Sequence, residues 1–265
     1  MYTRRKLMTG TAAVLGANMI WNPKARANDA PDQWLHETAY INFSHRLIAE
    51  TALSLTQDTN DAIDTARAIF CFVRDEIAFG FARGFWDNSA SAVLKSRIGY
   101  CNTKSTLFVA LLRASGIPAR QVFVDIHASV LDGIIDPGTP YVDHSYVEVW
   151  LNGAWIATDS YIVDRALFEP AQAKVNQEGR LLGYGVHQTG SSDWDGQQPS
   201  FSQFNQLDTR PISTCRWGVF EDVGDFYRHA ERPWNRLNPF LRAGFGTFSA
   251  GANRRAERLR ELQYE

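Results

Sequence analysis

Cys101, His144 and Asp159 are residue types that together could carry out acyl transfer through a thioester. A thiol becomes a useful nucleophile when its thiolate is favoured, and a helix N-terminus favours the thiolate through unpaired N–H groups and the helix dipole. An imidazole then exchanges protons with the sulfur, and a carboxylate fixes the tautomer of the imidazole. This chemistry requires that the fold bring the three side chains together.

Cys101 stands directly before a segment that we predict to be a buried helix. Apolar residues recur at helical spacing over 102–115, and Gly116 and Pro118 follow as helix-ending residues. The thiol is therefore predicted to lie at the N-terminus of an interior helix.

A predicted β-hairpin positions the imidazole and the carboxylate. The dipeptide Asn152-Gly153 is a strong hairpin signal between two apolar runs, 145–151 and 154–160. With a two-residue or a four-residue turn, His144 and Asp159 become diagonal neighbours on one face of the sheet. Diagonal positions lie ~7 to 8 Å apart, which these two side chains can close to a hydrogen bond. A three-residue turn would break this pairing.

The remaining elements are predicted from local patterns alone. We expect helices at 34–56, 60–77, 89–94, 221–232 and 252–264, strands at 77–81 and 119–126, and loops at 127–143 and 183–204. No repeat or linker marks a domain boundary. The simplest organisation is a core over 28–165 and a C-terminal extension, 166–265, packed on the same domain.

Composition places the chain among ordinary globular proteins. Of its 265 residues, 45% are hydrophobic and 21% charged, which excludes disorder, collagen and coiled coil. Beyond residue 27 there are 22 basic and 29 acidic residues. This balance argues against a nucleic-acid partner, because such affinity comes largely from Lys and Arg.

The first 27 residues have the pattern of an export signal. Arg4-Arg5 begins a basic region, a modest apolar run follows, and Ala25-Arg26-Ala27 resembles a cleavage site. The paired arginines resemble a twin-arginine signal. The apolar run is roughly 15 residues, whereas a span needs ~20. We therefore expect a periplasmic or secreted mature protein without a stable membrane span.

The other two cysteines are predicted to be structural. Cys71 lies in an apolar run and is expected to be buried, and Cys215 has no partner pattern around it. A disulfide between these two residues stays open at this point.

Four ordered motifs resemble the core of the transglutaminase-like superfamily, over roughly residues 60 to 165. They are Gly99-Tyr100-Cys101, the helix end 110–120, the strand 144–149 and Trp155-Ile156-Ala157-Thr158-Asp159. The resemblance implies an α+β, papain-like fold in which the nucleophile helix packs against an antiparallel sheet. It also implies that Cys101 is the nucleophile, His144 the general base and acid, and Asp159 the orienting carboxylate.

The resemblance extends to a tryptophan upstream of the thiol. In members related to tissue transglutaminases, a Trp-x-x-Ser stretch supplies a Trp that stabilises the oxyanion, and Trp86-Asp87-Asn88-Ser89 is similar. The alternative for Trp86 is a packed aromatic beside Phe85. The backbone N–H of Cys101 is the more general oxyanion donor.

Rival assignments use other polar residues of the same region. His127 and His187 lack a hairpin-paired acid, and Asp164 could replace Asp159. A zinc site from Cys101, His127 and His144 would lack a ligand pair of the usual spacing, so we expect no metal and no cofactor.

The sequence thus predicts an exported cysteine-nucleophile enzyme that hydrolyses peptide or amide bonds. Two alternatives stay open: transfer of the acyl group to an amine, and a non-catalytic binding or assembly protein on the same scaffold. The expected substrate is a peptide or protein, with cell-wall peptide a candidate because of the compartment. The oligomeric state is not predicted.

Overall fold

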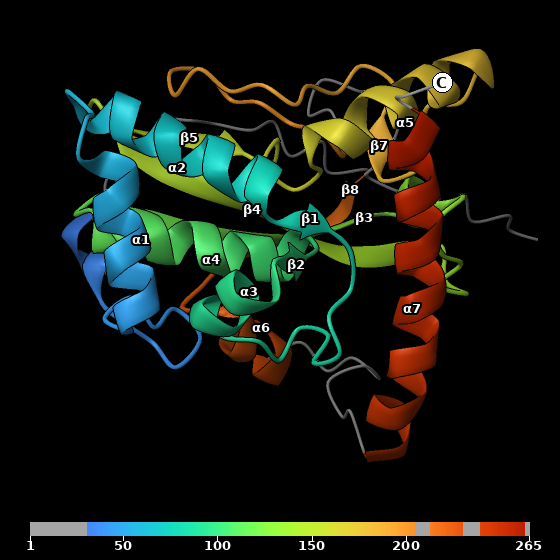
Figure 1. Ribbon diagram of the computed structural model, residues 1–265, viewed down its shortest axis with the longest axis horizontal. Coiled ribbons are helices and arrows are strands. Elements are labelled where there is room, and N and C mark those ends of the chain that lie inside the picture. The colour runs from blue at the N-terminus through green and yellow to red at the C-terminus, as the bar shows by residue number, and fades with distance from the viewer. Residues whose placement is uncertain (1–30, 205–212, 230–238, 263–265) are drawn as a thin grey trace, which may run out of the picture.

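The computed structural model describes residues 31–204, 213–229 and 239–262, and combines helices with an antiparallel sheet (Figure 1). The α+β fold class predicted from the sequence is confirmed. The helices, with η for 3₁₀ helices, are η2 (Pro31–Leu35), α1 (Arg46–Thr56), α2 (Ala62–Glu76), α3 (Ala90–Ser96), α4 (Cys101–Ala114), η3 (Ala128–Leu131), α5 (Arg165–Gln177), α6 (Val223–His229) and α7 (Pro239–Glu261). The strands are β1 (Ala78–Phe79), β2 (Ile98–Gly99), β3 (Ala119–His127), β4 (Tyr141–Leu151), β5 (Ala154–Thr158), β6 (Leu182–Gly183), β7 (Val186–His187) and β8 (Ser213–Phe220).

The main sheet has the strand order β5-β4-β3-β8, and its neighbouring strands are antiparallel. Helix α4 packs against β3 and β4, and α1, α2 and α3 pack against α4. Figure 1 shows α4 running between these helices and the sheet. The helix that begins at Cys101 is therefore the centre of the fold.

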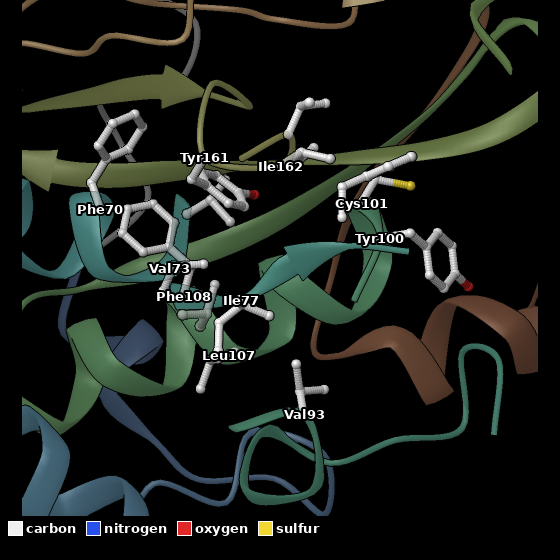
Figure 2. Packing of buried hydrophobic residues seen from close by; sticks show 14 of the residues in the cluster. Phe70, Val73, Ile77, Val93, Tyr100, Cys101, Leu107, Phe108, Tyr161 and Ile162 are labelled. Carbon is white, nitrogen blue, oxygen red and sulfur yellow. The ribbon is translucent and has the colours of Figure 1, made fainter. Parts of the chain in front are cut away.

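Helix α4 is buried from Cys101 through Arg113. Its apolar side chains, including Leu107 and Phe108, join the core of α2 and of the segment after β5 (Figure 2). At its start, the backbone N–H of Tyr100 donates to the hydroxyl of Thr103 at 3.1 Å. At its end, Gly116 adopts φ +74°, a left-handed conformation that glycine takes without steric cost. The predicted helix and its ending are thus confirmed.

The predicted hairpin is also confirmed, including its register. Leu151 pairs with Ala154 across the two-residue turn, and the same register continues along the strands to the pair of Val147 and Thr158. Asn152 and Gly153 both have positive φ, 50° and 81°, which is typical of a tight hairpin turn.

Several local predictions were wrong. The first α-helix begins at Arg46 rather than 34, and the last helix begins at Pro239 rather than 252. Helix α5 and strand β8 were missed. Strand β8 pairs with β3, about ninety residues earlier in the chain, so its partner cannot be identified from a local pattern.

Segment 183–204 is more ordered than the predicted surface loop. It contributes β7, and the side chains of Val186, His187, Ser202 and Phe204 are buried. Phe204 packs with Tyr146 and Ala157 on one face of the main sheet. This segment therefore forms part of the core beside the hairpin.

Cys71 is an exposed free thiol, so its predicted burial was wrong. The buried stripe of α2 passes through Ile69, Phe70 and Val73, and Cys71 lies outside that stripe. The side chain of Cys215 and residues 1–30, with the predicted export signal, lie outside the described residues.

Within the described ranges, no helix is both long enough and apolar enough to span a membrane.

Candidate active site

His144 and Asp159 form a buried hydrogen-bonded pair at the hairpin. His144 lies on β4 and Asp159 directly follows β5, and their side chains are 1% and 0% exposed. Nε2 of His144 lies 3.0 Å from Oδ2 of Asp159. With the ring hydrogen on Nε2, the other nitrogen, Nδ1, carries a lone pair. Nδ1 is buried and has no hydrogen-bond partner in the described part of the chain, so it can act as a base.

Ser202 holds the carboxylate of Asp159 from the other side. Its backbone N–H and its hydroxyl both donate to Oδ1, the hydroxyl at 3.1 Å. Phe204 packs edge-on against the ring of His144, with 5.5 Å between ring centroids. Sequence reasoning missed Ser202, because nothing local distinguishes it from the other serines of its segment.

The sulfur of Cys101 lies beside the strand position that follows His144. The backbone N–H groups of Ser145 and Asn102 donate toward it, and its own S–H donates to Oδ1 of Asn102 at 3.6 Å. Figure 2 shows the sulfur at one end of the buried cluster, beyond Ile162. The structure therefore places the sulfur beside the backbone of β4 at Ser145, the residue after His144, with the thiol proton directed at Asn102.

Burial raises the pKa of the Cys101 thiol well above its ordinary value, and the charge of Asp143 raises it further. The N–H donors of Ser145 and Asn102 lower this pKa without offsetting burial. The expectation that the helix N-terminus favours the thiolate of Cys101 was therefore wrong. A base must remove the proton during attack on a carbonyl.

Residues 49–160 match the model of the transglutaminase-like superfamily. This part of the chain, less than half of its length, is therefore similar to that superfamily. Among solved structures, a "putative cysteine protease" from Cytophaga hutchinsonii is 14% identical, with a TM-score of 0.45. The match covers 77% of this chain and 51% of that one, so this chain spans about half the length of that protein. A comparison with curated proteins finds no match.

The superfamily segment holds Cys101, His144 and Asp159 and supports cysteine-type catalysis. Ser202 lies outside this segment, as does Tyr227 of α6, whose phenol lies near the thiol. Part of the candidate site therefore comes from chain beyond the superfamily core.

Trp86, the predicted oxyanion donor of the superfamily core, packs on Tyr227 rather than on Phe85. The rings of Trp86 and Tyr227 are stacked, with centroids 4.6 Å apart, and Phe85 stacks on Tyr100. Nε1 of Trp86 is buried without a hydrogen-bond partner among the described residues. An unsatisfied buried donor is costly, so an acceptor supplied by a substrate would stabilise this arrangement. The catalytic role of Trp86 stays a prediction.

The rival residues bind elsewhere. His127 contacts Ser129 at 2.8 Å, and Nδ1 of His187 accepts the N–H of Thr189. The carboxylate of Asp164 caps α5 and accepts hydrogen bonds from Arg260 of α7, so it binds these partners rather than His144. No group of three or more His, Cys, Asp or Glu in the described ranges is arranged to hold a metal ion.

Proposed function

We propose that this protein is an exported cysteine enzyme that hydrolyses peptide or amide bonds through a thioester on Cys101. The observation that carries the proposal is the buried pair of His144 and Asp159, in which Nδ1 has no hydrogen-bond partner among the described residues. The residue after His144 is Ser145, whose backbone N–H contacts the sulfur. The match of residues 49–160 to the superfamily model supports cysteine chemistry but leaves the acyl acceptor open.

In the proposed mechanism, Nδ1 of His144 takes the proton of Cys101 while the sulfur forms a bond to the substrate carbonyl carbon. The carbonyl oxygen becomes an oxyanion, stabilised by the backbone N–H of Cys101 and Nε1 of Trp86. The imidazolium then protonates the leaving amine as the C–N bond breaks. The carboxylate of Asp159 orients the imidazole and stabilises the imidazolium.

The thioester is resolved by water, with Nδ1 of His144 as the base. Attack by water breaks the C–S bond, releases a carboxylic acid and returns the proton to the thiol. A primary amine in place of water would give transamidation by the same steps. Water is the proposed acceptor because no sequence feature indicates a channel for lysine.

A peptide library incubated with the mature protein tests the proposal. Mass spectrometry should find cleaved products with the wild type and none with Cys101→Ala. Cys71→Ala is the matched control, because it removes an exposed thiol away from the pair and should leave activity intact. Products that appear only when a primary amine is added would contradict hydrolysis and favour transamidation.

One observation favours the alternative of a non-catalytic binding or assembly protein: the raised pKa of the Cys101 thiol. Absence of product with both the wild type and Cys101→Ala would support that alternative.

The proposed compartment depends on residues 1–27 and is tested separately. Replacing the paired arginines, Arg4→Lys with Arg5→Lys, should retain the full-length precursor inside the cell. Periplasmic or secreted localisation would make cell-wall peptides a candidate substrate class. Unchanged fractionation of the double variant would overturn twin-arginine export.

A further inference from the structure

Asn102, Asp143 and Tyr227 form a closed set of hydrogen bonds beside the thiol. Nδ2 of Asn102 donates to Oδ2 of Asp143 at 2.7 Å and to the phenol oxygen of Tyr227 at 3.0 Å. The phenol of Tyr227 donates to the same Oδ2 at 2.7 Å. The three residues come from α4, β4 and α6, so the set connects three elements at the sulfur.

This arrangement fixes which way the amide of Asn102 faces. Its side chain is fully buried, and both partners of Nδ2 lie on one side. A flipped amide would direct its oxygen at the carboxylate of Asp143, which is repulsive. Oδ1 is therefore held toward Cys101, where it accepts the thiol proton at 3.6 Å.

The electrostatic surroundings of the thiol are set mainly by acidic groups. Burial raises the pKa of Cys101, the charge of Asp143 is the next cause, and Asp159 also contributes. Asp125 of β3 lies directly opposite Asp143 in the sheet register. Each element packed around the thiol and Asp143 contributes titratable groups. They are Tyr100 before α4, Asp125 of β3, His144 of β4, Asp159 and Tyr161 after β5, and Tyr227 of α6.

We propose that Asn102 and Asp143 are positioning residues that hold the Cys101 thiol protonated and turned onto Asn102 until an acyl substrate binds, and that Tyr227 orients these two side chains and partly offsets the charge of Asp143. The proposal rests on the proposed role of Cys101 as nucleophile. On substrate binding, the S–H turns from Oδ1 of Asn102 to Nδ1 of His144, and the proton passes to the imidazole. A resting thiol also resists oxidation, because the thiolate is the reactive form.

Two conservative variants separate the charge of this network from its hydrogen bonds. Asp143→Asn keeps one oxygen that accepts from Asn102 and Tyr227, removes the negative charge and puts an NH2 donor in place of the second oxygen. Tyr227→Phe keeps the ring stacked on Trp86 but removes a donor to Asp143, so the negative charge near the sulfur is less compensated. The two variants should therefore change thiol reactivity in opposite directions.

The measurement is the rate of iodoacetamide alkylation of Cys101 against pH, with the modified residue identified by peptide mapping and no substrate present. Asp143→Asn should react about tenfold faster at neutral pH, which corresponds to about one pKa unit. Tyr227→Phe should react about threefold slower. Tyr184→Phe is the matched control, because it removes a phenol–carboxylate bond to Glu178 at a distant site and should follow the wild type.

We expect Cys101 to be alkylated faster in Asp143→Asn and slower in Tyr227→Phe than in the wild type. Any other pair of results overturns the proposal. Acceleration of both variants would indicate general loosening of the site, since a loosened site exposes the sulfur in either case. Failure of the proposed function is recognised independently of the alkylation rates, because either the wild type would show no turnover or Cys101→Ala would retain it.

Discussion

At the scale of single residues, the candidate site depends on carboxylates that are held in place by donors. Asp159 accepts from His144 on one oxygen and from Ser202 on the other, so it cannot rotate freely. Such support fixes the tautomer and orientation of an imidazole, which general acid–base catalysis requires.

Ser202→Ala should lower kcat by about tenfold with little change in KM, because one hydrogen bond to a charged group is lost while the backbone N–H of residue 202 still donates. Asp159→Asn should cost far more, because the amide no longer stabilises the imidazolium. Steady-state kinetics on the best peptide of the library measure both. Ser129→Ala, which alters a contact of His127, is the control. Equal kcat for Ser202→Ala and wild type would show that Ser202 does not orient Asp159.

The places of Cys101, His144 and Asp159 in the fold could be predicted because their signals are local. The Asn152-Gly153 turn fixes the hairpin register, and helical spacing after Cys101 reveals α4. Ser202 and Tyr227 could not be found this way, because their roles arise only when distant segments pack on the hairpin and on α4.

At the scale of the element, α4 contains a lysine that is fully buried. Nζ of Lys104 donates to the carbonyls of Arg74 at 3.2 Å and Ile77 at 2.6 Å. These two acceptors match the two hydrogens of a neutral amine. Burial lowers the pKa of Lys104 from 10.5 to about 7. The helix that carries the thiol is therefore stabilised by deprotonation of this side chain.

The lowered pKa predicts that stability rises with pH above about 7. Between that value and 10.5 the unfolded chain binds a proton that the folded chain does not, so the slope is positive, at most about 1.4 kcal/mol per pH unit. Lys104→Met should reduce this slope, and Lys95→Met, at an exposed position of α3, should keep it. Urea unfolding between pH 7 and 9.5 measures the difference. Parallel curves for Lys104→Met and wild type would contradict a neutral lysine.

At the scale of the whole molecule, helix α7 connects segments that are far apart in the chain. Asn253 pairs with the backbone of Phe81, Arg255 donates to the carbonyl of Ile134, and Arg260 binds Asp164 and the carbonyl of Phe79. Alternating charges along a helix are typical of a solvated face, but Arg260 is largely buried. A helical charge pattern does not reveal that an acid in another segment is the partner.

Arg260→Met should destabilise the protein by roughly 3 to 5 kcal/mol, because it leaves the buried carboxylate of Asp164 without its cation. Burial alone would raise the pKa of Asp164, but the hydrogen bond and charge of Arg260 hold it below 3.8. A carboxyl group whose pKa is lower in the folded chain than in the unfolded chain stabilises the fold at pH values above its ordinary pKa. This stabilisation is lost as the pH falls through the pKa of the folded chain. The variant should therefore lose less stability than the wild type between pH 4 and pH 2, in addition to being less stable at pH 7.

Urea titrations at these pH values measure both effects, with Arg258→Met, at an exposed position of α7, as the control. If Arg260→Met and Arg258→Met unfold at the same urea concentration, α7 is not held to the core by this ion pair.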